Sequence, residues 1–319
     1  MRRSEFDVTD QICTTEPSVV EGEVMRLYRG LYSGKPSPQI GRAFSDMELL
    51  YKGKHGDYHS CDTEYHDIQH VLDVTLTTAR LLDGYERGRN GRAPLPPEYF
   101  SVGIIAALFH DFGYLRRRDD NEHRYGAEYT LTHVSRGANF MLVYLPGIGW
   151  KQHAEAAAQL VHFTGYERKV DTIKLDDPVM RRVGEIIGSA DIIAQMADRC
   201  YLEKCRDRLY PEFVLGGLTR RMQPDGKFIT VYESGIDLVR KTPGFYVNAM
   251  KRLDDELHRA YDYAEVNLGG DNVYLDEMDK NMRYARVAEV ADEADPLRRN
   301  PPNTLPPGVR GYPEDVVIP

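Results

Sequence analysis

The amino-acid sequence predicts an all-α fold, a helical bundle with at most one small hairpin. Two observations support this prediction. Through most of the chain, apolar residues recur at the three- and four-residue spacing that places them on one face of a helix. The pattern of a strand or hairpin is confined to residues 223–234, where Asp225-Gly226 precedes Lys-Phe-Ile-Thr-Val-Tyr.

The helices are predicted from their periodicity and from the residues that start and stop them. The first covers residues 18–33 and ends at Gly-Lys-Pro. A polar loop at 52–63 precedes a helix at 64–84, and Pro96-Pro97 open an apolar helix at 97–111. Further helices are expected over residues 123–143, 151–163, 177–198, 199–222 and 243–267. From Asp295 onward the sequence is rich in proline, which predicts an extended tail.

The chain of 319 residues is expected to hold one central domain with an extension at each end. The central, metal-binding helical domain covers residues 51–270. A helical N-terminal extension covers residues 1–50, and a C-terminal extension with the proline-rich tail covers 271–319.

Composition narrows the set of partners. A net charge of -9 argues against binding to a nucleic acid polymer, because such binding needs clustered lysine and arginine. No apolar run approaches the ~20 residues that span a bilayer, and the N-terminus has no signal core, so we expect no membrane partner and a cytoplasmic location. The spacing of the four cysteines fits no zinc ribbon or disulfide framework, which indicates reduced thiols.

Histidine and aspartate residues occur at the ends of apolar helices. His110 and Asp111 end the run at 97–111, Asp191 follows a second apolar stretch, and His66 and His70 are spaced to share one helical face. We expect the metal ligands to be His70, His110, Asp111, His133, His162 and Asp191.

Two divalent transition-metal ions are the cofactors that this inventory predicts. One ion is assigned to His70, His110, Asp111 and Asp191. The other is assigned to His133, His162 and the second oxygen of Asp111, which makes Asp111 the bridging carboxylate. A set rich in histidine favours Mn, Fe, Co, Ni or Zn over Mg or Ca. Such a pair activates a hydroxide and neutralises charge on a phosphoryl group, and the open coordination positions suit catalysis.

Two further groups are candidates for catalysis and substrate binding. His66 lies one turn before His70, and a histidine beside the metals can protonate a leaving alkoxide; its alternative role is a hydrogen bond to the site. The charged loop after the metal helix carries Arg116, Arg117, Arg118 and Arg124. We expect Arg117, Arg118 and Arg124 to contact phosphate oxygens, with a solvated loop as the alternative.

These residues resemble the HD superfamily of metal-dependent phosphohydrolases over about residues 64–200. Within this superfamily, the residues look most like those of bacterial HD phosphohydrolases that have YHxxxHV, FHDxxY and NExxxA elements. The matching residues, in order, are Tyr65-His66-Asp67, His70-Val71, Phe109-His110-Asp111, Tyr114, Asn121-Glu122, Ala127 and Asp191. The resemblance implies the HD helical fold and hydrolysis of a phosphoester.

Residues 65–74 are also similar to class I cyclic-nucleotide phosphodiesterases, a likeness that implies His66 as the leaving-group acid and His70 as a ligand. The chain departs from that class because Asp67 replaces its Asn and the HPGxxN element is missing. The surroundings of His133 and His162 resemble the HD-GYP phosphodiesterases of cyclic di-GMP. Tyr114 replaces the lysine of that group, and no proline follows Gly165-Tyr166, so the chain falls outside it.

The same ligand order occurs in mixed-valent diiron oxygenases of the HD fold, and a non-catalytic HD ligand-binding domain is a third reading. His66 and the arginine loop favour hydrolysis, while the full ligand set argues against an idle domain. The prediction is therefore a phosphohydrolase acting on a small phosphoester of nucleotide or cyclic nucleotide type. A metal-bound hydroxide would attack the phosphorus, and His66 would protonate the leaving group. The sequence leaves the substrate, the metal and the oligomeric state open.

Overall fold

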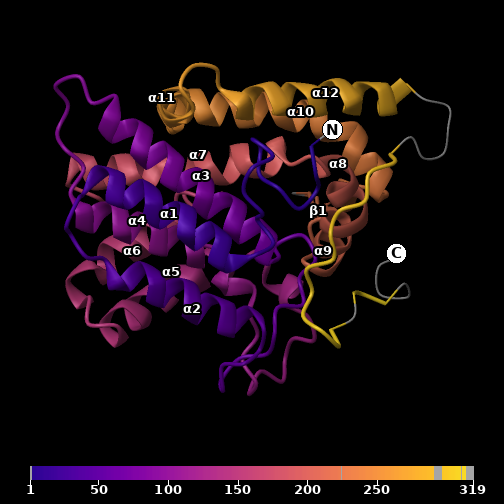
Figure 1. Cartoon of the computed structure of the whole chain (residues 1–319). Helices are drawn as coiled ribbons and strands as arrows, with labels where there is room; N and C mark the ends of the chain where they lie inside the picture. Colours follow the sequence, from indigo (N-terminus) through magenta and orange to yellow (C-terminus); the bar gives the residue numbers. More distant parts are fainter. Residues whose placement is uncertain (1, 224, 291–296, 310, 314–319) are drawn as a thin grey trace.

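The computed structural model describes residues 2–223, 225–290, 297–309 and 311–313. Over these residues it confirms the all-α prediction: helices form a bundle, and the sheet structure is a single two-stranded hairpin (Figure 1). No described helix combines the length and the apolar character that crossing a bilayer requires.

Two N-terminal helices pack on the bundle. Helix α1 (Pro17–Leu31) contacts α3, and α2 (Pro38–Tyr51) contacts α4. The expectation of a helix at 18–33 is confirmed, whereas α2 had not been predicted. The buried apolar faces of both helices belong to the same core as the rest of the bundle.

The centre of the bundle consists of α3 (Ile68–Arg87), α4 (Pro97–Phe109) and α7 (Pro178–Ala197), which contact one another. Helix α4 is buried along almost its whole length because it is apolar on every side. The predicted helix at 177–198 is confirmed. The helix expected at 64–84 begins instead at Ile68, because the Asp67 side chain accepts a hydrogen bond from the His70 amide and caps it.

Helices α5 (His133–Gly147) and α6 (Ala154–Val161) pack against each other beside α4. The prediction of a helix at 123–143 is wrong in its first half, which forms a turn and a short 3₁₀ helix. The carboxylate of Glu128 accepts hydrogen bonds from the amides of Arg124 and Tyr125, at 2.5 and 2.9 Å, and so stabilises this turn.

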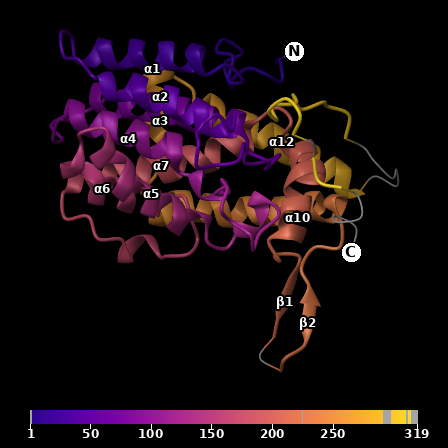
Figure 2. The ribbon, with the colours of Figure 1, turned by 90° about the horizontal axis from the view of Figure 1, so that it is seen from below.

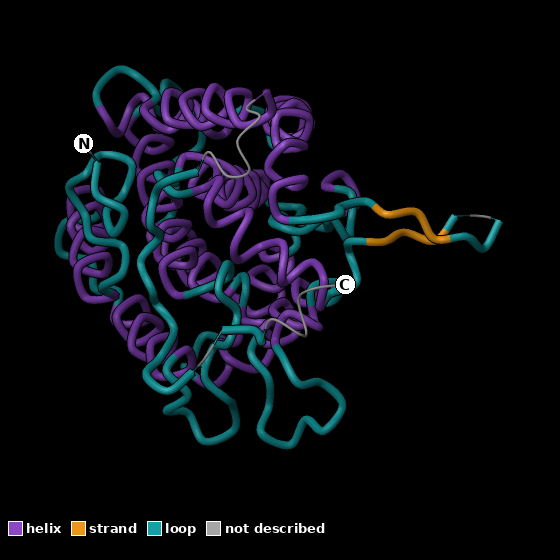
Figure 3. The backbone as a smooth tube through the Cα atoms, turned by 90° about the vertical axis from the view of Figure 1, so that its right-hand side faces the viewer, coloured by secondary structure: helices purple, strands orange, loops and turns teal. Residues whose placement is uncertain are grey.

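The helix expected at 199–222 is interrupted. It forms α8 (Tyr201–Lys204), a π-helical turn (Cys205–Leu209) and α9 (Tyr210–Leu215). Pro211 lacks an amide hydrogen, so regular α-helical bonding cannot continue through it. A hairpin follows, with strands β1 (Arg220–Met222) and β2 (Phe228–Thr230) paired in antiparallel register. It confirms the predicted hairpin and projects from the bundle (Figures 2 and 3).

The C-terminal part begins with α10 (Gly235–Lys251), which replaces the start of the helix expected at 243–267. The short α11 (Tyr263–Leu268) and the long α12 (Val273–Val290) follow, and α12 packs on α7 and α10 along one side of the bundle (Figure 1). The described part of the tail, residues 297–309, contains no helix or strand. The Arg208 guanidinium donates to its Pro302 carbonyl at 2.7 Å, which holds the tail on the bundle; Asp295 lies outside the described residues.

Candidate metal centre

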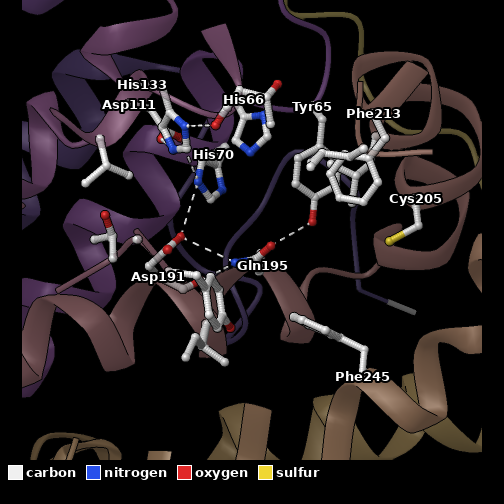
Figure 4. A pocket seen from close by; sticks show the side chains of 18 of the residues that line it. Tyr65, His66, His70, Asp111, His133, Asp191, Gln195, Cys205, Phe213 and Phe245 are labelled. Atoms are coloured by element: carbon white, nitrogen blue, oxygen red, sulfur yellow. Dashed lines mark hydrogen bonds and ion pairs between the residues drawn. The ribbon is translucent and has the colours of Figure 1, made fainter. Parts of the chain in front are cut away.

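Four of the expected ligands meet at one end of a cavity. His70 comes from the first turn of α3, His110 and Asp111 follow the last turn of α4, and Asp191 comes from α7. Nε2 of His70 lies 3.2 Å from Oδ2 of Asp111 and 3.4 Å from Oδ1 of Asp191 (Figure 4). Nε2 of His110 lies 3.2 Å from Oδ2 of Asp111. The structure thus brings together the whole set that the sequence assigned to the first ion.

Backbone carbonyls orient two of the histidines. Nδ1 of His110 lies 2.7 Å from the carbonyl oxygen of Ala107, and Nδ1 of His133 lies 2.7 Å from that of Thr130. In each ring the proton is therefore assigned to Nδ1, which leaves the lone pair of Nε2 facing the carboxylates. This hydrogen bond from the distal ring nitrogen is the usual support of a histidine that binds a metal.

The two oxygens of Asp111 face different partners. Oδ2 faces His70 and His110, while Oδ1 lies 3.6 Å from Nε2 of His133. Oδ2 is buried and has no hydrogen bond of good geometry within the described part of the chain. A buried carboxylate oxygen in that state requires a cation or another donor. The candidate metal-holding group of the described residues is His70, His110 and Asp191, and Asp111 lies beside it with one oxygen toward that group and the other toward His133.

Charge in the site is concentrated on the carboxylates. Burial alone would lower the pKa of His70, yet its contacts with Asp111 and Asp191 raise that pKa to about 10. Burial opposes ionisation of Asp111, but His110 and His66 hold its pKa well below the ordinary value. Burial lowers the pKa of His133, which favours its neutral form. A proton on His70 offsets the negative charge of Asp111 and Asp191. A metal ion bound between these side chains would do the same, so protons and metal ions compete for this site.

Gly113 allows the backbone of His133 to lie close to the turn that follows Asp111. A Cβ atom on Gly113 would lie 1.9 Å from the carbonyl oxygen of His133, a distance that no side chain tolerates. The Arg136 guanidinium donates to the Gly113 carbonyl at 2.7 Å and to that of Leu115 at 2.9 Å. These contacts fix the start of α5 against the turn that follows Asp111.

The structure does not bring His162 to the other expected ligands. His162 is buried at the C-terminal end of α6, and it is absent from the described residues that line the cavity. Its Nδ1 makes no hydrogen bond to any described residue. Burial lowers the pKa of His162. The charges that act on this pKa are those of Arg168 and Glu167, and neither is an expected ligand. The expected second half-site is therefore represented by His133 and one oxygen of Asp111.

His66 reaches the cavity from a turn and not from a helix. The expectation that His66 and His70 share a helical face is wrong, because α3 begins after Asp67. The two rings still lie close, with centroids 5.7 Å apart. The His66 ring also stacks on Tyr114 at 4.4 Å, and Tyr114 stacks in turn on His133 at 4.4 Å. His66 thus lies beside the metal centre with its ring held on one face.

Glu212, the partner of His66, was not predicted from the sequence. Glu212 lies on α9 and is 0% exposed. Its Oε2 lies 2.5 Å from Nδ1 of His66, and its Oε1 accepts a hydrogen bond from the Tyr65 amide at 2.7 Å. This contact fixes the His66 ring. Only the interrupted path of the chain through α8 and α9 brings the glutamate here, so no spacing along the sequence could indicate it.

Gln195 was missed as well, although a signal was present. It follows Asp191 by one helical turn, and its Nε2 lies 3.1 Å from the Asp191 carbonyl oxygen and 3.4 Å from Oδ1. Its Oε1 accepts a hydrogen bond from the Tyr65 hydroxyl at 2.9 Å (Figure 4). The four-residue spacing from an expected ligand could have identified it as a support.

The arginines expected to bind substrate lie elsewhere. Arg117 pairs with Asp119 at 2.9 Å, and Arg118 donates to the Gly53 carbonyl at 3.1 Å. The guanidinium of Arg124 lies 5.8 Å from the ring of Tyr125. All three side chains belong to exposed residues, and none of them lines the cavity. In this structure they match the alternative of a solvated loop.

The cavity has a volume of about 620 Å³ and two different ends. Its inner end carries His66, His70, Asp111, His133 and Asp191, and its outer end is lined mainly by aromatic and aliphatic side chains. No protein-family model, curated protein or solved structure matches this chain. The resemblance to HD phosphohydrolases is therefore carried by the motif residues alone.

Proposed function

We propose that this chain is a metal-dependent phosphohydrolase. The observation that carries the proposal is the position of Asp111, whose two oxygens face His70 and His110 on one side and His133 on the other. Together with Asp191, this donor set of imidazole nitrogens and carboxylate oxygens suits Mn, Fe, Co, Ni or Zn. His162 is left outside the proposed set, because it does not line the cavity.

In the proposed reaction, different residues would hold the metal ions and position the substrate. Bound ions would supply an activated water and would offset negative charge on the phosphoryl oxygens. His70, His110 and Asp191 would hold one ion, and His133 would hold the other more weakly because fewer side chains support it. Asp111 would fix the spacing between them. A phosphoester at the inner end of the cavity would then lie against these groups and beside His66.

His66 is assigned as the leaving-group acid and Glu212 as its positioning residue. With Nδ1 held by Glu212, the other ring nitrogen of His66 is the one left to act on substrate. As the bond from phosphorus to the leaving oxygen breaks, that nitrogen would donate its proton to the oxygen. The buried carboxylate of Glu212 would stabilise the charged imidazolium before the transfer.

The test combines metal analysis with a substrate panel. Purified protein would be reconstituted with Mn, Fe, Co, Ni or Zn and assayed for release of phosphate or of alcohol from monoesters, diesters and cyclic nucleotides, with oxygen uptake followed in parallel. The proposal expects metal-dependent ester cleavage without oxygen consumption. Oxygen uptake coupled to substrate loss, with a mixed-valent diiron signal, would establish the oxygenase instead. Bound metal with no turnover on the panel would favour a ligand-binding domain.

A further inference from the structure

The outer end of the cavity forms a separate space, which we call the outer chamber. It is built by α8, the π-helical turn after it, α9 and α10. The residues that define it are Tyr65, Tyr201, Cys205, Phe213, Leu238 and Phe245. Phe245 projects into this space from α10, opposite Phe213 and Cys205 (Figure 4). The chamber opens directly onto the metal centre, because both ends belong to one cavity.

Several polar groups at the outer end of the cavity are already engaged. The hydroxyl of Tyr65 donates to Oε1 of Gln195 at 2.9 Å. Thr242, which also lines the cavity, donates to the Leu238 carbonyl of its own helix at 3.1 Å. A chamber with these groups occupied offers a ligand apolar and aromatic surface, but few free donors or acceptors to read a nucleobase.

The outer chamber also offers no free positive charge within the described part of the chain. Lys241 is the one lysine or arginine among the described cavity-lining residues. Its Nζ donates to Asp237 and to the Val231 carbonyl, each at 2.7 Å. Burial raises the pKa of Cys205 to about 12 and that of Tyr201 well above its usual range, so both stay neutral. A second or third phosphate group would find only Lys241 there, whose ammonium is already paired with Asp237.

We propose that the outer chamber binds an uncharged, mainly hydrocarbon group of the substrate, so that the phosphoester carries one phosphoryl group at the metal centre and an apolar body beyond it. This inference rests on the proposed phosphohydrolase function, and it names the substrate class for that site. Binding gains from apolar contact grow with the length of the buried group, whereas a nucleoside would leave its polar edges without partners.

The test uses n-alkylphosphonates from ethyl to octyl, which resemble the ester but cannot be hydrolysed. Their affinity would be measured by calorimetry on metal-free protein and on protein loaded with Mn²⁺. We expect the dissociation constant to fall about threefold to fourfold for each buried methylene until the chamber is full. The slope should be the same with and without metal, because it reports the burial of methylene groups in the outer chamber and not the contact of the phosphonate with the metal ligands. A nucleoside phosphonate should bind at least about tenfold more weakly than the octyl compound.

A matched pair of phenylalanine variants locates the effect. Phe245→Ser should weaken octylphosphonate binding about fivefold to tenfold and flatten the dependence on chain length. Its side chain is 40% exposed, so the fold should tolerate the change, which the melting temperature would check. Phe228→Ser, on the projecting hairpin and 67% exposed, is the control and should leave affinity unchanged.

The outcomes separate this inference from the function on which it rests. Affinity that does not depend on chain length, or tighter binding of the nucleoside phosphonate, would overturn the assignment of the outer chamber. An equal loss in Phe245→Ser and Phe228→Ser would do the same. Chain-length dependence without hydrolysis of any alkyl phosphoester would uphold the chamber and reject the hydrolase. Hydrolysis with no preference for long alkyl groups would uphold the hydrolase and reject the chamber.

Discussion

The two ends of the cavity are built from different kinds of helix. The inner end takes four of its candidate ligands from α3, α7 and the end of α4, which are regular, largely buried helices, and backbone carbonyls orient His110 and His133. The outer chamber lies between α10 and the segment formed by α8, a π-helical turn and α9, where the helix is interrupted before Pro211. Regular helices hold donor atoms in fixed positions, whereas an interrupted helix leaves space between side chains. Under the proposed function, the inner end would carry the chemistry and the outer chamber would select the substrate.

The largest effect is expected at Asp111, where Asp111→Ala removes the carboxylate that both half-sites share. The first half-site keeps His70, His110 and Asp191, whereas the second keeps only His133, so elemental analysis should find at most one metal per chain and activity should fall by more than about 10⁴. The exposed Asp119→Ala is the control and should keep its metals. Two metals per chain in Asp111→Ala would contradict the bridging assignment.

His66→Ala should separate proton transfer from metal binding within the inner end. We expect kcat to fall by about 10² to 10⁴ on esters with poor leaving groups, while the metal content stays normal. The loss should shrink for nitrophenyl esters, which depart without a proton. His55→Ala, at an exposed position, is the matched control. An equal loss on both kinds of ester, or a loss of metal, would reject the acid role.

Gln195 connects the two ends, because it contacts both Asp191 and the Tyr65 hydroxyl. Removing its amide in Gln195→Ala should loosen Asp191 and weaken metal affinity by about tenfold to a hundredfold. A competition titration with a metal-binding dye would measure this change. The exposed Gln152→Ala serves as the control. Unchanged affinity in Gln195→Ala would show that Asp191 needs no support from it.

The smallest effect is expected at the arginine loop. Arg117→Ala removes a guanidinium that pairs with Asp119 and does not line the cavity, so kcat/KM should change by less than about twofold. Steady-state kinetics on the best ester of the panel would test this. A loss of tenfold or more would mean that the loop closes over bound substrate, and the sequence expectation for Arg117 would then be correct.

The positions of the candidate ligands could be predicted where they lie on, or directly after, a long and regular helix. His70, His110 and Asp191 mark the ends or faces of apolar helices, so their convergence follows from packing those helices together. Periodicity also predicted α1 and α7, and the Asp225-Gly226 turn predicted the hairpin.

Helix boundaries could not be predicted where local hydrogen bonds override the periodicity. Contacts could not be predicted where the two partners lie far apart in the sequence. Asp67 caps α3 and thereby removes His66 from the helix, and Glu128 turns the chain before α5. Glu212 lies on the short helix α9, which follows the π-helical turn and ends at Leu215, and it contacts His66 from there. The positions of Arg117 and the other loop arginines depend on partners such as Asp119, which charge alone could not identify.

The most direct test of the central claim is an anomalous diffraction map of crystals grown with Mn²⁺ or Co²⁺. The account predicts a strong peak about 2.0–2.3 Å from Nε2 of His70, Nε2 of His110 and a carboxylate oxygen of Asp191 and of Asp111. It predicts a weaker second peak between the other oxygen of Asp111 and Nε2 of His133. A map without a peak at these side chains, or with its strongest peak on other residues, would contradict the account.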